Sequence, residues 1–500
     1  MKRREFLAAG AGMALGSVLG LGHMPWTSST AGAEARRKPN IIVVFTDDMG
    51  YADLGVQGQL DDIKTPHIDQ MAKEGVRFTD GYITAPQCSP SRAGLVTGRY
   101  QQRFGFDNIA DTPLSREERS IADYLKPAGY ISGMVGKWHL DPTIISHDWA
   151  EQQVQEVERR PNGTLIVPQE LAQRYYPQEF GFDEYFKGQM NPYWANYDLE
   201  GNDLEPDGER IHDDTYRLDV QTDAALAFIE RNHDTPFFLY LNYFAPHTPL
   251  EATEEYLSRH PGDMPTRRRY ALAMTSAMDD GVGKIIDTLQ QHGIDEDTLI
   301  IFTSDNGAPL KLTMVDNPID TDPGGWDGSR NDPLVGEKGM LTEGGIRVPF
   351  VARWKGVIPE GLVYREPVSS LDIAATAVAL AGRDKPAGLD GVNLIPYLTG
   401  DKEGAPHEAL FWRFWTQSAI RKGPWKYLTV GDQVEYLFDL SSEEHEHRNR
   451  IADHPELAAE LRAELEAWAA ELQNPVGIPT GTLNNQEINW YNHHLGASLG

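Results

Sequence analysis

The chain of 500 residues is long enough for two packed domains, and a composition of 40% hydrophobic and 24% charged residues excludes collagen, coiled coil and wholesale disorder. Its 45 lysines and arginines against 75 aspartates and glutamates give a net charge of −30, which argues against binding nucleic acid or docking on anionic membranes. The single cysteine, Cys88, excludes an intramolecular disulfide framework.

Residues 1–33 have the organisation of an export signal peptide. A basic head at residues 2–4 precedes an apolar stretch at 7–21, and small residues at 31–33 suit cleavage. The adjacent arginines are typical of a twin-arginine signal, which exports folded proteins. The apolar stretch is shorter than a bilayer requires, which disfavours a permanent anchor. We therefore expect the export machinery to deliver a protein with no stable membrane insertion to the periplasm or the extracellular space.

Residues 34–400 are predicted to form an α/β domain, because short apolar runs alternate with helical patterns. Strands are expected where β-branched and aromatic residues form buried runs, at 40–46, 130–135, 236–244, 298–303 and 348–354. Helices are expected at 65–74, with Thr65 as the N-cap and Pro66 at the first position, and at 120–126, 267–292 and 369–380. This alternation predicts a large central mixed sheet, mostly parallel and flanked by helices.

Residues 401–500 have a different pattern, and the expected boundary lies within residues 394–406. Three closely spaced strands at 409–415, 419–430 and 434–440 precede a helix at 455–472 that is rich in Ala, Leu and Glu. These elements predict a smaller C-terminal subdomain with an antiparallel sheet and one helix. Residues 142–179 and 310–330 show no clear periodicity, and we expect long loops there, which often carry substrate contacts.

Four of the predicted strands lead into clusters of polar residues. The clusters are Asp47-Asp48, residues 136–139 (GKWH), residues 246–249 (PHTP) and Asp305-Asn306. Ligands in open α/β sheets bind outside the carboxyl ends of the strands. If the strands are parallel, all four clusters lie at one edge of the sheet and can converge on one site.

Two of these clusters, Asp47-Asp48 and Asp305-Asn306, supply only oxygen ligands. Three carboxylates and an amide suit a hard divalent cation, Ca²⁺ or Mg²⁺. Zinc fits less well, because the cluster contains neither Cys nor His. Taken singly, the first pair is more often a helix N-cap and the second a turn. Their joint position at strand ends favours a metal site.

The cysteine begins a distinctive segment, residues 88–99 (CSPSRAGLVTGR). Pro90 suits the first turn of a helix, which places Cys88 at the positive N-terminus. That position is expected to lower the pKa of the thiol and to favour anions. A lone cysteine is usually a small buried hydrophobe, but the flanking Pro, Ser and Arg disfavour that interpretation.

The pattern Cys88-x-Pro-Ser-Arg followed by Leu-x-Thr-Gly-Arg resembles the signature of the formylglycine-dependent type I sulfatases, an alkaline-phosphatase-like family. The resemblance covers nearly the whole mature chain. Its other motifs, in the family's order, are Asp47-Asp48, 136–139, Pro246-His247, 305–307, 336–339, 343–349 and 437–440. It implies an alkaline-phosphatase-like catalytic domain that hydrolyses sulfate monoesters by S–O cleavage.

The resemblance also implies how residue 88 reacts. A separate formylglycine-generating enzyme oxidises Cys88 to Cα-formylglycine. One oxygen of its hydrate attacks the sulfur of a sulfate monoester, the S–O bond of the ester breaks, and the alcohol leaves. A base then takes the proton from the second hydroxyl, which ejects sulfate and restores the aldehyde. A plain serine would not suffice, because its sulfate has no second hydroxyl to drive breakdown.

Further roles follow from the same resemblance. It implies a Ca²⁺ ion, favoured over Mg²⁺, that acts as Lewis acid and template. The ligands implied are Asp47, Asp48, Asp305 and Asn306. The resemblance also implies that Arg92 and Lys137 stabilise the hydrate and that His139 is the base. It implies that His247 and Lys338 bind sulfate and assist the leaving oxygen.

The substrate is expected to be a sulfated carbohydrate. Candidates for stacking on sugar rings or binding further anionic groups are Trp194, Trp326, Trp412, Trp415, Arg330 and Arg413, although such aromatics are more often core residues. The segment 324–345 resembles carbohydrate sulfatases more than small aryl-ester enzymes, which favours sulfated polysaccharide or oligosaccharide, such as algal galactans or glycosaminoglycans. Two alternatives remain: a phosphonate or phosphate monoester hydrolase of the same superfamily, and a noncatalytic protein that binds sulfated glycans.

Overall fold

The computed structural model describes residues 38–109, 112–143, 146–153, 158–310, 326–431, 434–474 and 485–496. The predicted export signal lies outside the described residues, as does most of the predicted loop at 310–330. Among the helices that are described, none combines the length and the apolar character needed to cross a membrane.

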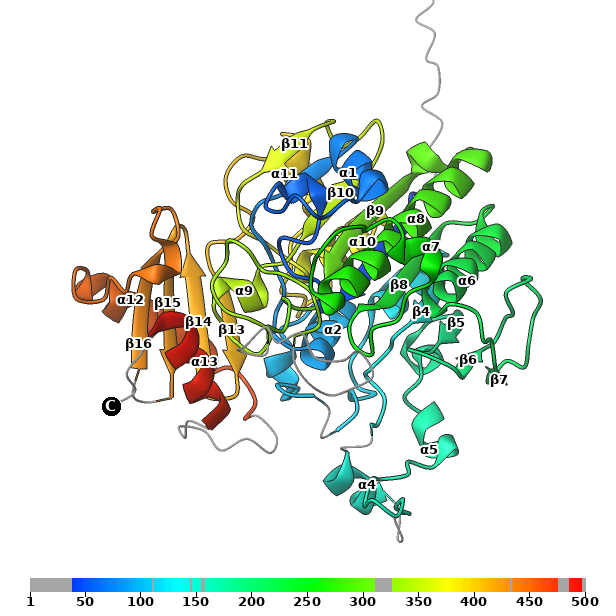
Figure 1. Ribbon diagram of the computed structural model, residues 1–500, viewed down its shortest axis with the longest axis horizontal. Helices are drawn as coiled ribbons and strands as arrows, with labels where there is room; N and C mark the ends of the chain where they lie inside the picture. The colour runs from blue at the N-terminus through cyan, green and yellow to red at the C-terminus, as the bar shows by residue number, and fades with distance from the viewer. Residues whose placement is uncertain are drawn as a thin grey trace, which may run out of the picture. The chain divides into compact units, whose positions relative to one another are not determined.

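A mixed sheet of ten strands forms the centre of the fold (Figure 1). In spatial order its strands are β11 (Leu362–Tyr364), β2 (Val76–Phe78), β10 (Phe350–Arg353), β9 (Thr298–Ser304), β1 (Asn40–Asp47), β8 (Phe237–Pro246), β4 (Ile131–Gly136), β5 (Glu184–Lys187), β6 (Tyr193–Ala195) and β7 (Glu209–Ile211). The five strands β9, β1, β8, β4 and β5 are parallel, and antiparallel pairs follow on both sides. The predicted large mixed sheet flanked by helices is confirmed.

Strand β1 is buried along its whole length, as a central parallel strand must be when helices cover both faces of the sheet. Ile41, Val43 and Phe45 pack into one core and Ile42 and Val44 into another, because successive side chains point to opposite faces. The first core includes helices α2 (Cys88–Thr97), α3 (Ile121–Leu125) and α10 (Leu371–Leu380). The second includes α1 (Pro66–Lys73), α6 (Arg217–Asn232) and α8 (Thr266–Gln291).

A separate antiparallel sheet follows near the C-terminus, with strands β13 (Leu410–Phe414), β14 (Gln417–Lys422), β15 (Trp425–Val430) and β16 (Val434–Asp439). Helix α12 (Pro455–Ala469) packs on one face, and α13 (Asn485–Leu495) contributes to the core on the other. The prediction of one strand over 419–430 is wrong. Gly423, at a φ of 57°, and Pro424 turn the chain there, so the segment holds parts of two strands.

The start of α1 agrees with the sequence only in part. Thr65 is the N-cap residue and Pro66 the first helical residue, but the Thr65 side chain makes no capping hydrogen bond. The first turn is instead capped by Asp279 of α8, whose carboxylate accepts hydrogen bonds from the backbone N–H groups of His67 at 3.1 Å and Ile68 at 2.8 Å. A carboxylate at a helix N-terminus satisfies free donors and complements the helix dipole.

The remaining described elements are short. Segment 142–179, expected to be a loop, contains helices α4 (His147–Gln153) and α5 (Gln169–Gln173). Strands β3 (Gly81–Tyr82) and β12 (Val368–Ser369) form a small parallel pair. Helices α7 (Glu254–Leu257), α9 (Glu343–Ile346) and α11 (Ile395–Leu398) are single turns. The division between domains at residue 400 stays a prediction.

Candidate active site

The predicted polar clusters lie together at the carboxyl edge of the parallel strands. Asp47 ends β1, Lys137 follows β4, His247 follows β8 and Asp305 follows β9. Because β1 is parallel to both β8 and β9, and β8 to β4, these strand ends lie at the same edge. The expectation that the four clusters meet at one edge of the sheet is confirmed.

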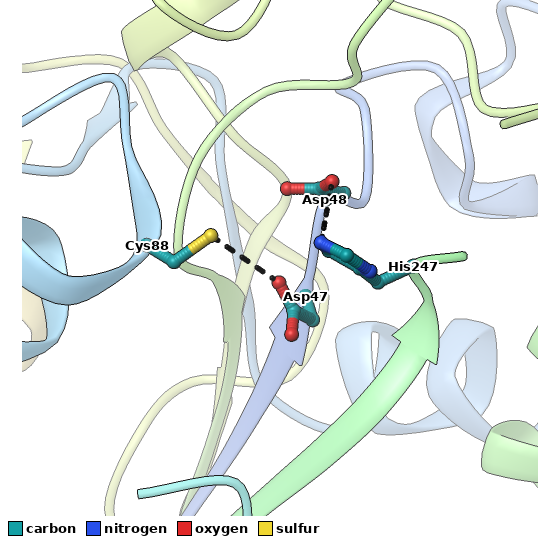
Figure 2. Close-up of side chains that lie close together, drawn as sticks. All are labelled: Asp47, Asp48, Cys88 and His247. Atoms are coloured by element: carbon teal, nitrogen blue, oxygen red, sulfur yellow. Dashed lines mark hydrogen bonds and ion pairs between the residues drawn. The ribbon is translucent and has the colours of Figure 1, made fainter. Parts of the chain in front are cut away.

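Cys88 is the first residue of α2 and is buried beside the aspartates (Figure 2). Its Sγ lies 3.7 Å from Asp47 Oδ1, and the Nζ of Lys338 donates a hydrogen bond to it at 3.1 Å. Burial raises the pKa of the thiol to about 12, outweighing the lowering effect of Lys137 and Lys338. The predicted lowering of this pKa is therefore wrong. Desolvation destabilises the buried thiolate more than the helix N-terminus and the two lysines stabilise it.

Arg92 lies one turn further along α2 and is fully buried. Its Nη2 and Nε donate to Asp305 Oδ2 at 2.8 and 3.1 Å. Its Nη1 donates to Asn242 Oδ1 at 3.0 Å and to the backbone carbonyl of Lys137 at 3.2 Å. Asn242 belongs to the site although the sequence analysis did not select it. An amide within the apolar strand 236–244 was the available signal.

Two lysines are directed at the aspartates from different loops. The Nζ of Lys137 lies 2.5 Å from Asp47 Oδ2, and the Nζ of Lys338 lies 2.5 Å from Asp48 Oδ1. Burial by itself raises the pKa of Asp47, but nearby positive charges, with Lys137 first, bring it well below its ordinary value. Gly136 has a φ of 91°, and a Cβ there would lie 2.0 Å from the carbonyl oxygen of Asn242, so only glycine fits before Lys137.

The two histidines of the site differ in their surroundings. His139 adopts a left-handed φ of 58°, and its buried Nδ1 has no hydrogen-bond partner among the residues that the structure describes. Burial, reinforced by the charges of Lys137 and Arg92, holds the pKa of His139 well below its ordinary value, so the ring is neutral at neutral pH.

His247 is more open, with 26% of its side chain exposed. Its Nε2 faces Asp48 Oδ2 at 3.6 Å (Figure 2). Its Nδ1 lies 2.5 Å from the backbone carbonyl of Thr248. Burial lowers the pKa of His247, although Asp47 and Asp48 oppose the shift.

The oxygen ligands fit a cation, by two observations. The Oδ1 of Asn306 is buried and has no hydrogen-bond partner within the described chain, while its Nδ2 donates to Asp48 Oδ1 at 2.6 Å. Burial and the neighbouring charge of Asp47 raise the pKa of Asp305 to about 7. A buried carboxylate with a raised pKa lacks sufficient positive charge around it to stabilise its ionised form. A divalent cation would supply that charge and would use the free amide oxygen.

Two further side chains, a thiol and an imidazole, lie beside the predicted oxygen ligands. Atoms of Asp47, Asp48, Cys88 and His247 lie within 4.8 Å of one another. Asp305 directs Oδ2 at Arg92 and accepts from the backbone N–H of Asp48 on Oδ1 at 3.1 Å. The four predicted ligands contain neither Cys nor His, and the fold brings the thiol of Cys88 and the imidazole of His247 beside two of them, Asp47 and Asp48.

Known proteins of one family are similar to this chain over most of its length. Residues 39–383 match the Sulfatase family, and residues 336–473 match "N-sulphoglucosamine sulphohydrolase, C-terminal". The chain is 33% identical over 426 residues to N-acetylgalactosamine-6-sulfatase of Mus musculus, covering 79% of this chain and 72% of that protein. It is 32% identical over 410 residues to the uncharacterized sulfatase YdeN of Escherichia coli, covering 75% and 68%.

A solved structure is similar over a still longer stretch. The crystal structure of Ps i-CgsB in complex with k-i-k-neocarrahexaose has a TM-score of 0.71 and 30% sequence identity, covering 91% of this chain and 98% of that one. The similarity therefore extends over most of the chain.

Proposed function

Because this chain belongs to the sulfatase family and is a sulfuric ester hydrolase, we propose that it desulfates carbohydrates, with residue 88 as the nucleophile after oxidation of Cys88 to Cα-formylglycine. The observation that carries the proposal is the position of Cys88. It begins α2, its Sγ lies 3.1 Å from Lys338 Nζ, and the carboxylate of Asp47 is beside it. A formylglycine hydrate would supply at this place two hydroxyls, one to attack sulfur and one to drive sulfate release.

The surrounding cations explain how an acidic protein draws in a sulfate ester. Arg92, Lys137 and Lys338 all point into the site, where they are paired with Asp47, Asp48 and Asp305. A bound divalent cation would add the excess charge that makes the local field positive despite the net charge of −30. In our proposal Arg92 and Lys137 stabilise the oxygens on residue 88, while Lys338 and His247 hold the sulfate group and assist the leaving oxygen. His139 accepts the proton that accompanies sulfate release, and its lowered pKa keeps the ring available as a base.

We propose Ca²⁺ as the cation held by Asp47, Asp48, Asp305 and Asn306. Hard oxygen donors favour Ca²⁺ or Mg²⁺, and conversion of Cys88 to formylglycine replaces the nearby thiol by oxygen. Bound there, the ion would offset two of the three carboxylate charges and polarise a sulfate oxygen.

The nucleophile is tested by variants at residue 88. Protein made with a formylglycine-generating enzyme should show an aldehyde in place of the thiol in the peptide containing Cys88, measured by mass spectrometry. Cys88→Ala should abolish turnover of an aryl sulfate, and Cys88→Ser should allow no more than one turnover because serine lacks the second hydroxyl. Both variants should keep the wild-type melting temperature within a few degrees. Multiple turnover by either one contradicts the assignment.

The cation is tested by its removal. Dialysis against a strong chelator should lower both activity and melting temperature, because the buried carboxylates then repel one another. Added Ca²⁺ should restore both quantities more completely than Mg²⁺ or Zn²⁺. An unchanged rate in protein shown by elemental analysis to be free of metal would rule out this cation site, and restoration by Zn²⁺ alone would assign a different ion.

The substrate class is tested by comparing leaving groups. We expect a higher kcat/KM on sulfated oligosaccharides than on an aryl sulfate, and only weak hydrolysis of aryl phosphate and phosphonate. A preference for the phosphonate would favour the phosphonate monoester hydrolase alternative, and binding of sulfated glycans without turnover by formylglycine-bearing protein would favour the noncatalytic one.

Export is part of the same proposal. The twin-arginine pattern in residues 1–33 supports delivery to the periplasm or beyond, where polymeric sulfated carbohydrates are accessible. N-terminal sequencing of protein recovered from the periplasm should begin near residue 34. Recovery of uncleaved chain from the cytoplasm alone would contradict the proposal.

A further inference from the structure

A groove of about 690 Å³ opens beside the active site, and His139 lies in its wall. We call it the His139 groove. The lining residues that matter here are His139, Asp141, Arg160, Lys187, Met190 and Trp194. Gly136 of β4 is the register partner of Lys187 on β5, so the groove extends from the loop that carries His139 to the neighbouring strand β5.

Of the four tryptophans considered for stacking on a sugar ring, Trp194 is the one in this groove. Trp412 and Trp326 are buried and donate their indole N–H groups to backbone carbonyls at 2.7 and 2.6 Å. Trp415 packs against Phe414 and Trp490 with ring centroids at 4.8 and 5.8 Å. Trp194 is only partly buried and lines the groove.

Of the basic residues considered for further anionic groups, Arg330 and Arg413 are engaged elsewhere. Arg330 pairs with Asp332 at 2.7 Å, and Arg413 pairs with Asp107 at 2.8 Å. Arg160, which the sequence analysis did not select, is exposed and lines the groove. It provides a positive charge at the rim of the groove.

An ion pair in the groove wall offers a donor and an acceptor side by side. The Nζ of Lys187 lies 2.8 Å from Asp141 Oδ2, and the two side chains keep 16% and 14% of their surface exposed. The same Nζ lies 4.0 Å from the centroid of the Tyr176 ring, which holds the lysine in place. Such a pair retains hydrogen-bonding capacity for a ligand that carries adjacent hydroxyl groups.

Apolar surface is also exposed in the groove. Only three large hydrophobic side chains stand out as exposed in the part of the chain that the structure describes, and two of them, Ile166 at 38% and Met190 at 40%, lie here. Exposed apolar groups that gather beside charged ones in a concave surface are typical of a ligand site.

We propose that the His139 groove binds the carbohydrate part of the sulfate ester, with Trp194 as the platform for a sugar ring and the Lys187–Asp141 pair bonding to its hydroxyls. Arg160 meets a further sulfate or carboxylate group of the same oligosaccharide. The inference rests on the proposed function and deepens it, since it assigns the residues that distinguish a sugar substrate from a small aryl ester. It makes Trp194 a specificity-determining residue with no part in the bond cleavage.

The test compares two substrates that share the sulfate group and differ in the rest. Formylglycine-bearing wild type, Trp194→Ala and Trp194→Phe are assayed on 4-nitrophenyl sulfate and on a panel of sulfated oligosaccharides that includes k-i-k-neocarrahexaose and an N-acetylgalactosamine-6-sulfate disaccharide. Trp194→Ala should lower kcat/KM for the oligosaccharide by roughly 10-fold or more, as for loss of one large aromatic contact, mainly through KM. The kcat/KM of Trp194→Ala for the aryl sulfate should change by less than about 2-fold. Trp194→Phe should recover most of the kcat/KM lost on the oligosaccharide.

Two controls complete the experiment. Trp425→Ala removes a partly exposed tryptophan of β15 in the C-terminal sheet. This variant should leave kcat/KM for both substrates unchanged. Melting temperatures identify any variant that fails to fold, and Lys187→Gln, which keeps a donor but removes the charge, gives an independent variant of the same groove. Lys187→Gln should also lower kcat/KM for the oligosaccharide more than for the aryl sulfate.

The outcomes separate this inference from the proposed function. Wild type inactive on every sulfate ester contradicts the proposed function itself. In a second outcome, the wild type hydrolyses both substrates while Trp194→Ala lowers kcat/KM for both equally or for neither. That result overturns the groove assignment but not the sulfatase site. Activity on the aryl sulfate alone overturns the groove assignment together with the carbohydrate substrate.

Discussion

Arg92 brings together at one buried point groups from four segments of the chain. A buried guanidinium is tolerated only when its donors are satisfied, and those of Arg92 reach Asp305, Asn242 and the backbone of Lys137. Desolvation by itself lowers the pKa of Arg92, but Asp305 and Asp47 raise it above its ordinary value, so the side chain stays charged. The residue therefore fixes the positions of α2, β4, β8 and β9 relative to residue 88.

Asn242 provides a test of this arrangement at the residue scale. Asn242→Ala removes the acceptor at 3.0 Å from Arg92 Nη1 and leaves a buried charged donor unsatisfied. We expect kcat/KM on an aryl sulfate to fall by about 10–100-fold, the usual effect of losing a partner that orients a reactive group.

Asn40 supplies a matched control for this variant. It is a buried amide at the opposite end of the sheet, where it bonds to Thr298 Oγ1 and to the N–H of Phe237. Asn40→Ala should lose stability and leave kcat/KM nearly unchanged. Equal losses of kcat/KM in the two variants would show that Asn242 acts only through stability.

At the scale of elements, helix α10 is held by a carboxylate shared among several partners. Asp372, in its first turn, accepts hydrogen bonds from the backbone N–H groups of Ser369 and Val392, both at 2.8 Å. The Nε2 of His407, from the segment before the C-terminal sheet, lies 2.8 Å from the same carboxylate. One buried acid thus connects the helix to two later loops.

This contact should make stability depend on pH. Burial lowers the pKa of His407, but Asp372 outweighs it, so the pKa in the folded protein is raised. The stabilisation from protonated His407 is therefore complete below the unfolded pKa of about 6.5 and is lost as pH rises through the folded value. His407→Gln should lose about 1.5–3 kcal/mol near pH 5.5 and much less near pH 9, measured by urea unfolding. A difference between the two proteins that does not vary with pH would contradict the ion pair.

At the scale of the whole molecule, a buried charge cluster joins the C-terminal sheet to the active-site region. Lys426 of β15 is fully buried and contacts Glu343 of α9 at 2.9 Å and Glu446 at 3.0 Å. Glu343 also accepts a hydrogen bond from the hydroxyl of Tyr82 at 2.6 Å. The C-terminal sheet is thereby tied to the segment that follows Lys338.

Removing the positive charge of Lys426 should weaken this connection. Lys426→Met leaves two buried carboxylates facing each other, which should cost about 3–5 kcal/mol of unfolding free energy. Combining it with Glu343→Gln and Glu446→Gln should recover part of that loss, because the repulsion disappears. Chemical unfolding measures both effects. A triple variant no more stable than Lys426→Met would show that packing, not charge, dominates here.

Much of the architecture could be predicted because it depends on local patterns. The apolar run of β1 is sufficient by itself to locate that strand, and the helix expected over 120–126 agrees with α3, whose N-cap in the structure is Ser120. Helix α6 was missed, although Leu218, Ala225 and Phe228 fall on a helical period, because the segment before it lacks a clear start signal. The strand over 419–430 was misjudged because β-branched and aromatic residues continue on both sides of Gly423.

The amino-acid sequence alone indicated that Asp47, Lys137, His247 and Asp305 lie together, because residues that follow parallel strands meet at one edge whatever the details of packing. Only the tertiary structure decided the environment of those side chains. It raised the pKa of Cys88 by burial, brought Asn242 to Arg92, and left Trp194 in a groove while it buried Trp326 and Trp412. Burial, charge compensation and exposure depend on contacts between distant segments, and no local pattern contains them.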